Sequence, residues 1–284
     1  MTAKIVDIHP HVISTDTVKY PVAPIGGVRS GWSATRPITF EQLVAEMDEA
    51  GVARAAIVHS STTYGHDNSY VADCVAQMPQ RFTGVYSFDV LAPDAVKTFD
   101  YWLGRGMTGI RLFTGGHTNQ TKGEWLVDPK SFPVWERAAE LGMTIVIQTT
   151  PDGLHMVRTL AQRFPKVKIA LDHLGRPELE EGPPYNNAAG LFALSEFSNI
   201  YLKVTPTACV RVKAGKSSPE TFFPRLVEAF GANHIAFGSN YPASEGPLKK
   251  IVTDMQASLS CLSEEDRSWI MGRTAQVLYP VLSD

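Results

Sequence analysis

Eight short apolar segments recur along this chain of 284 residues, and amphipathic segments separate them. The apolar segments are rich in Ile, Val and Leu, which is typical of strands buried on both faces of a parallel sheet. They cover residues 5–9, 55–59, 82–88, 109–113, 144–148, 169–173, 201–205 and 235–239. Because strand and helix patterns alternate without a change of composition, we predict an α/β fold, a single (β/α)8 TIM-type barrel domain spanning residues 1–284. An open doubly wound sheet is the alternative, but no Gly-rich turn follows the first strand.

The segments between the strands carry helix start and stop signals. Thr39 and Gln42 have the spacing of a capping box, and Gly51 ends the same pattern. Further helical patterns cover residues 93–106, 129–142, 154–164, 188–197 and 219–230. Three connections, 12–37, 114–128 and 176–187, are long, and long loops after barrel strands often control specificity.

Composition narrows the class of protein. With 44% hydrophobic and 19% charged residues, the chain has the make-up of a soluble globular protein. The net charge of -3 gives no support for nucleic acid or an anionic membrane as a partner. Cys74, Cys209 and Cys261 are odd in number and widely spaced, so we expect reduced thiols and a cytoplasmic location. We also expect no signal peptide and no membrane span, and a monomer or small homo-oligomer.

Polar side chains gather where the predicted strands end. They are His9, His11, His59, Ser60, Arg111, Gln148, Asp172, His173, Lys203 and Asn240. In barrels of this kind the chemistry lies at the carboxyl ends of the strands. Half of the eight histidines fall there. We therefore predict the site at this end of the barrel.

Histidines form the strongest part of this pattern. His9 and His11 are two residues apart and should point to the same side of an extended backbone, a spacing common in zinc and iron sites. The alternative is a pair of rim histidines held by backbone carbonyls. His173 is the third candidate. Because directions alternate along a strand, we expect only one of Asp172 and His173 to face the interior, with Asp172 in a structural role.

Basic residues suggest an acidic substrate. A strand-end Arg111 can bind a carboxylate through two parallel hydrogen bonds, and Lys203 can add a second positive charge. The alternative for both is a salt bridge to an acid of the protein. Arg211 extends this basic rim. Weaker candidates, since loop side chains are often merely packed or solvated, are Tyr20, Ser60, His59 and His117.

Three motifs together resemble the amidohydrolase superfamily. They are D-I-H-P-H at 7–11, D-H-L-G-R-P at 172–177 and F-G-S-N-Y-P at 237–242. The match spans the whole chain and looks most like the branch that contains 2-pyrone-4,6-dicarboxylate lactonase and D-galactarolactone isomerase. Metal-dependent members bind through first- and sixth-strand histidines, a fifth-strand residue and an eighth-strand aspartate. Here Gln148 and Asn240 take the last two positions and are poor ligands, so the resemblance implies no metal and no other cofactor.

The resemblance also implies a reaction. In the lactonase an eighth-strand carboxylate is the natural base for activating water, a role worth about 10²–10⁴-fold. Asn240 cannot accept that proton. The implied activity is isomerisation of D-galactaro-1,5-lactone to the 1,4-lactone, in which a hydroxyl of the substrate attacks the carbonyl. The implied partner is a small acidic lactone.

The resemblance suggests a role for each candidate. His9, His11 and His173 would stabilise the oxyanion, and whichever is neutral would transfer the proton. Arg111 and Lys203 would hold the distal carboxylate. Asn240 would orient the hydroxyl. Three alternatives remain open: a metal-independent lactonase with a histidine base, a metal-dependent hydrolase or decarboxylase, and a barrel that only binds an acidic ligand.

Overall fold

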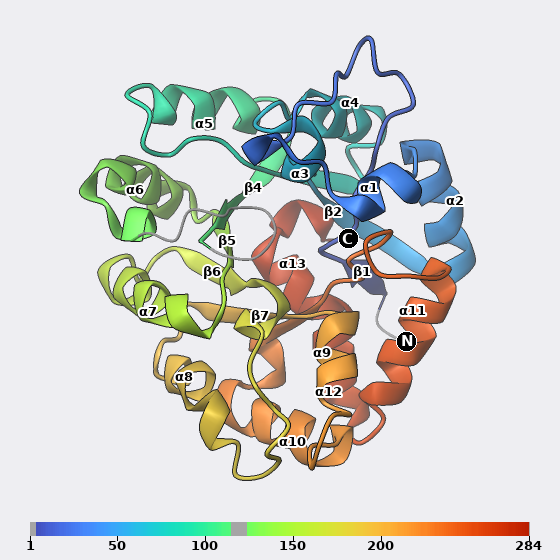
Figure 1. Cartoon of the computed structure of the whole chain (residues 1–284), viewed down its shortest axis with the longest axis vertical. Helices are drawn as coiled ribbons and strands as arrows, with labels where there is room; N and C mark the ends of the chain where they lie inside the picture. Colours follow the sequence, from blue (N-terminus) through green and yellow to red (C-terminus); the bar gives the residue numbers. More distant parts are fainter. Residues whose placement is uncertain (1–3, 115–123, 284) are drawn as a thin grey trace.

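The barrel predicted from the apolar segments is confirmed. The computed structural model describes residues 4–114 and 124–283, and its eight strands form one parallel sheet in the order β1 to β8 (Figure 1). The strands are β1 Ile5–Asp7, β2 Val52–Val58, β3 Phe82–Tyr86, β4 Met107–Phe113, β5 Thr144–Gln148, β6 Lys168–Leu171, β7 Ile200–Val204 and β8 Ile235–Phe237. Just after β1, the Ile8 amide donates to the Phe237 carbonyl at 3.2 Å, which joins the first strand to the last.

Helices surround the strands, as Figure 1 shows. They are α1 Gly31–Thr35, α2 Phe40–Ala50, α3 Ser61–Tyr64, α4 Ser69–Gln77, α5 Ala95–Leu103, α6 Phe132–Leu141, α7 Leu154–Arg163, α8 Ala189–Phe192, α9 Pro206–Arg211, α10 Pro219–Phe230, α11 Leu248–Ser258, α12 Glu264–Ser268 and α13 Thr274–Leu278. The capping box of Thr39 and Gln42 is present, and Gly51 ends α2 in the left-handed conformation at φ 71°. The predicted helix 188–197 is instead the short α8 and a 3-10 turn, Ala193–Glu196.

The C-terminal segment closes one end of the barrel. In Figure 1, α13 lies in the middle of the ring of strands. Inward-facing side chains of the strands form one buried cluster with Ala275, Leu278 and Tyr279. Thr144, the first residue of β5, donates its hydroxyl to the Leu278 carbonyl at 2.6 Å. This segment therefore plugs the end where strands begin, and only the opposite end can hold a substrate.

The long connection after β1 is tied to its neighbours at that open end. The Ser14 amide donates to the Tyr64 hydroxyl at 2.8 Å, and Arg36 donates to the Pro242 and Ala243 carbonyls at 3.3 and 3.1 Å. These contacts link the loops after β1, β2 and β8. The loop after β4 lies mostly at 115–123, outside the described residues, and His117 with it.

Two further expectations concern the chain as a whole. None of the helices within 4–114 and 124–283 has the length and apolarity needed to cross a membrane. The three cysteines are free, as the sequence predicted.

Candidate active site

Three imidazoles come together beyond the ends of β1 and β6. After β1 the backbone stays extended, because the His11 amide donates to the Tyr241 carbonyl at 2.7 Å and the Pro10 carbonyl accepts from Val58 at 2.8 Å. The ring centroids of His9 and His11 are 5.0 Å apart, and those of His9 and His173 are 5.1 Å apart. The three histidines that the sequence singled out therefore lie side by side.

Asp172, which the sequence suggested was structural, lies at the centre of this group. Its Oδ2 accepts from Arg111 Nε at 2.8 Å, and its Oδ1 lies 2.8 Å from Lys203 Nζ and 3.3 Å from His9 Nδ1. The carboxylate is fully buried. Arg111 and Lys203 thus bind an acid of the protein itself, the alternative that the sequence left open for both.

The expectation that Asp172 and His173 point in opposite directions was wrong. Strand β6 ends at Leu171, and His173 has φ 53° and ψ 30°, in the left-handed region. The alternation of a strand ends where the backbone turns, so both side chains reach the same site. The nearest ligand-type atoms of His9, Asp172 and His173 lie within 4.8 Å of one another.

The charges around Asp172 keep it ionised. Burial alone would raise the pKa of the carboxyl, but Lys203, His9 and Arg111 outweigh burial and hold that pKa well below its usual value. Asp172 thus faces two cations, and a second buried carboxylate, Asp7, also acts electrostatically on Lys203. A carboxylate held this way is a poor base, because protonating it would leave both cations without a partner.

The imidazoles are neutral at pH 7. Burial lowers the pKa of His11 to about 3 and that of His173 to about 4, and burial also takes the pKa of His9 well below its usual value. His11 Nδ1 donates to the Val58 carbonyl at 2.7 Å, so its Nε2 carries the free lone pair. Trp32 of α1 stacks on this ring, with centroids 5.1 Å apart, and shields one face. The free Nε2 of His11 is therefore a hydrogen-bond acceptor facing the group, although its lowered pKa makes the imidazole a weak base.

His173 and Arg111 complete the inner group. His173 Nδ1 lies 2.8 Å from Thr205 Oγ1, which leaves Nε2 for a ligand. Arg111 Nη2 donates to Gln148 Oε1 at 2.8 Å. Gln148 thus acts on the site through Arg111, whose Nη1 has no hydrogen-bond partner among the described residues. Lys203, by contrast, is 0% exposed.

Arg176, which was not among the predicted site residues, adds a positive charge at the mouth of the site. It ends the D-H-L-G-R stretch with φ 55°, is partly buried, and its side chain has no hydrogen bond or ion pair with any residue in 4–114 and 124–283. Burial, then the charges of Arg211 and Arg111, lower its pKa, yet a guanidinium stays protonated in proteins. Arg211 donates to the Pro177 carbonyl at 3.3 Å and has no carboxylate partner in the same part of the chain. The two arginines form a positive rim.

Other predicted residues lie apart from the imidazoles. Asn240 follows β8 with φ 52°, and its amide donates to Ser244 Oγ at 3.2 Å. The next residue, Tyr241, accepts from the His11 amide through its backbone carbonyl. Tyr20 donates its hydroxyl to Asp73 at 2.6 Å, away from the cluster.

The two candidates after β2 have internal partners. His59 Nε2 donates to the Gly65 carbonyl at 2.8 Å, and burial lowers the pKa of its imidazole to about 4. Ser60 Oγ lies 2.9 Å from Thr63 Oγ1. Both side chains are buried and shape the β2 loop beside the site.

The ligand-type group of His9, Asp172 and His173 does not fit a divalent cation as it stands. A metal on Asp172 Oδ1, at about 2.1 Å, would lie at most about 5 Å from the Lys203 ammonium, which is 2.8 Å from the same oxygen. The repulsion is about 7 kcal/mol at an effective dielectric constant of about 20. Arg111 holds the other oxygen.

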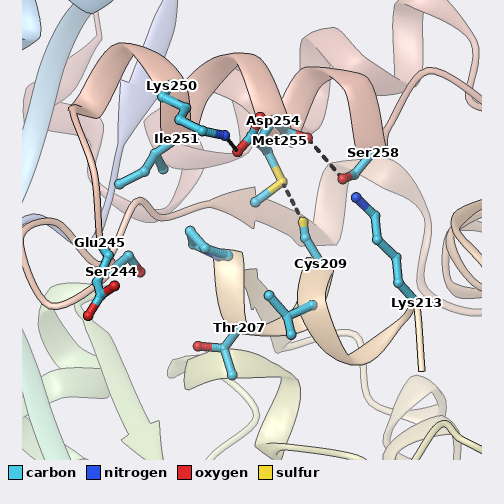
Figure 2. Close-up of a pocket in the computed structure, with 12 residues that line it drawn as sticks. Thr207, Cys209, Lys213, Ser244, Glu245, Lys250, Ile251, Asp254, Met255 and Ser258 are labelled. Carbon is cyan, nitrogen blue, oxygen red and sulfur yellow. Dashed lines mark hydrogen bonds and ion pairs between the residues drawn. The ribbon is translucent and has the colours of Figure 1, made fainter.

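A groove of about 670 Å³ lies elsewhere, between α9 and α11 (Figure 2). Its charged side chains include Lys250, paired with Asp254 at 2.6 Å. Cys209 lines it, but burial raises the pKa of that thiol to about 11, so it is no nucleophile at neutral pH. The imidazole cluster therefore remains the candidate active site.

Comparisons with known proteins agree with this fold. L-fucono-1,5-lactonase of Burkholderia ambifaria is 23% identical over 214 residues, which are 73% of this chain and 70% of the lactonase. A candidate 2-pyrone-4,6-dicarboxylic acid hydrolase from Pseudomonas putida superposes with a TM-score of 0.80 at 22% identity over 100% of both chains. An amidohydrolase from Burkholderia multivorans with bound zinc gives 0.77 at 20% identity, over 98% of this chain and 99% of the other. The Amidohydrolase family model matches residues 6–281. The chain therefore belongs to the Amidohydrolase family.

Proposed function

We propose that the protein is a sugar-acid lactone isomerase that converts D-galactaro-1,5-lactone to the 1,4-lactone without a metal. A lactone as substrate is in keeping with the two similar proteins named for fuconolactone and pyrone dicarboxylate. The reaction moves the ester from one hydroxyl of the substrate to another, so no water is consumed.

One observation carries the choice of isomerisation: the carboxylate of the cluster is unavailable as a base. Asp172 is held by Arg111 and Lys203. Asn240 follows β8, at the position where the resemblance implies a carboxylate in 2-pyrone-4,6-dicarboxylate lactonase. Water needs a base and a fixed position to attack, whereas a hydroxyl of the substrate is already tethered near its own carbonyl. The site therefore favours attack by the substrate itself.

His11 is the general base. Its neutral Nε2 takes the proton from the C4 hydroxyl as that oxygen bonds to C1. Arg111 Nη1 and His173 Nε2–H stabilise the oxyanion, with Thr205 donating its hydroxyl to His173 Nδ1. The bond from C1 to the C5 oxygen then breaks, and His11 returns the proton to that oxygen. The net change is zero in protons and in water.

Arg176 and Arg211 bind the distal carboxylate. This replaces the assignment to Arg111 and Lys203, because Asp172 already neutralises those charges. An arginine without a carboxylate partner is suited to a planar carboxylate through two hydrogen bonds. The positive rim thus supports an acidic substrate.

A hydrolytic lactonase is the second candidate. The same Nε2 of His11 that accepts a hydroxyl proton can accept one from water, and the fuconolactonase and the pyrone dicarboxylic acid hydrolase are hydrolytic by name. The two candidates share the site and differ in the attacking oxygen.

Product analysis tests the proposal. Purified protein is mixed with fresh D-galactaro-1,5-lactone, and the products are followed by ¹H NMR beside an enzyme-free control. We expect enzyme-dependent formation of the 1,4-lactone with no galactarate above the control. Enzyme-dependent galactarate as the first product would instead establish the lactonase, and no turnover would contradict both.

A further inference from the structure

The Lys203 ammonium lies beside His9, Asp172 and His173, the group of side chains whose ligand-type atoms could otherwise hold a metal ion. Its side chain, fully buried, comes from β7. The ammonium lies 2.8 Å from Asp172 Oδ1, the same oxygen that lies 3.3 Å from His9 Nδ1. Carboxylate and imidazole are the groups that would otherwise bind zinc.

Gly238 makes room for this arrangement. A Cβ at that position would lie 2.7 Å from the His9 Cβ and 3.2 Å from both Cγ and Cδ of Lys203. The residue after β8 must therefore be glycine for the aliphatic part of Lys203 to pass beside His9. The Lys203 side chain is therefore fixed in position by close packing against the Gly238 backbone and His9.

We propose that the Lys203 ammonium is a built-in replacement for a metal ion, and that removing its charge turns His9, Asp172 and His173 into a zinc site. This inference rests on the metal-free part of the proposed function. In the intact protein a zinc ion on Asp172 would add two positive charges beside the Lys203 ammonium and the Arg111 guanidinium, which already bind that carboxylate. Without Lys203 the carboxylate regains a free oxygen beside two neutral imidazoles.

Zinc binding tests the inference without relying on turnover. Wild type, Lys203→Met and Lys203→Ala are freed of metal, checked by circular dichroism and titrated with zinc by calorimetry. Bound metal is counted by mass spectrometry after dialysis. We expect zinc affinity in the neutral variants to rise on the order of 100-fold over wild type, with one ion per chain. Lys203→Arg, which keeps the charge, is the matched control and should bind no better than wild type.

The location is tested by adding His173→Ala to each background. The gain should disappear in Lys203→Met/His173→Ala. One zinc ion retained by wild type and lost in His173→Ala would overturn the inference, as would folded Met and Ala variants that bind no better than wild type. The wild-type measurement decides by itself if either variant fails to fold. If the zinc experiment contradicts this inference, isomerisation is still tested separately by the product analysis with NMR.

Discussion

Asp172→Asn is the most informative change for the stability of the site. The substitution keeps the size of the side chain and removes the one anion that faces both Arg111 and Lys203. Breaking a buried ion pair costs about 3–5 kcal/mol, because the remaining charge is left without a partner. Burial already lowers the pKa of Lys203, so this lysine can release its proton and limit the loss. We therefore expect Asp172→Asn to lower the free energy of unfolding by about 4 kcal/mol.

Urea and thermal unfolding measure that loss. For a chain of this size about 4 kcal/mol corresponds to a fall in Tm of about 7 °C. Asp73→Asn is a matched control. Asp73 also meets two cations, Lys19 at 3.0 Å and Arg105 at 2.5 Å, but its side chain is 30% exposed. Exposed pairs stabilise far less. Equal losses for the two variants would refute the argument that burial makes Asp172 critical.

The difference in unfolding free energy between wild type and Asp172→Asn should depend on pH in one direction. The pKa of Asp172 is lower in the folded protein than in the unfolded chain, where it has its ordinary value of 3.8. Its contribution is therefore fully present above about pH 4 and is lost as the pH falls toward the folded pKa. The gap in unfolding free energy between wild type and Asp172→Asn should narrow as the pH falls below about 4, where the wild type loses the contribution of Asp172. A gap that widens in acid would contradict this.

Four further predictions concern catalysis. With His11 as a base of pKa about 3, kcat/KM should stay flat from pH 8 to about 5, and an inflection near 6.5 would contradict the assignment. Asn240→Asp should add galactarate to the NMR product mixture, because a carboxylate tolerates the same left-handed backbone and can activate water; an unchanged product distribution would argue against the role of Asn240. Arg176→Ala should lower kcat/KM for the acidic lactone by about 10–100-fold, mainly through KM, and should spare a lactone without the carboxylate. His173→Ala should abolish turnover while its Tm stays within a few degrees of wild type, and near-normal turnover would sink its role.

The strands were predictable because each is a run of apolar residues buried on both faces, a pattern that does not depend on the neighbours. The end that carries the site was predictable for a similar reason, since parallel strands of a barrel share one end. His9 and His11 follow from the spacing alone, because the chain stays extended past Asp7.

The contacts of the charged groups were not predictable from the sequence. The direction of His173 depends on the end of β6 at Leu171, two residues before the end of the predicted strand 169–173. The pairing of Lys203 with Asp172 depends on how far β6 and β7 extend and on the space left by Gly238. That Arg176 has no carboxylate partner within 4–114 and 124–283 is seen only in the folded structure. Alternation along a strand cannot supply these facts.

Isomerisation in water enriched in ¹⁸O distinguishes attack on C1 by a hydroxyl of the substrate from attack by water. If a hydroxyl of the substrate attacks C1, the 1,4-lactone formed in the first turnovers should contain no ¹⁸O by mass spectrometry. If water opens the ring first, ¹⁸O should enter the C1 carboxyl group. When the acid then closes to the 1,4-lactone, a fraction of the lactone molecules should keep the label. Label in the enzyme-formed lactone above the enzyme-free control would contradict the account.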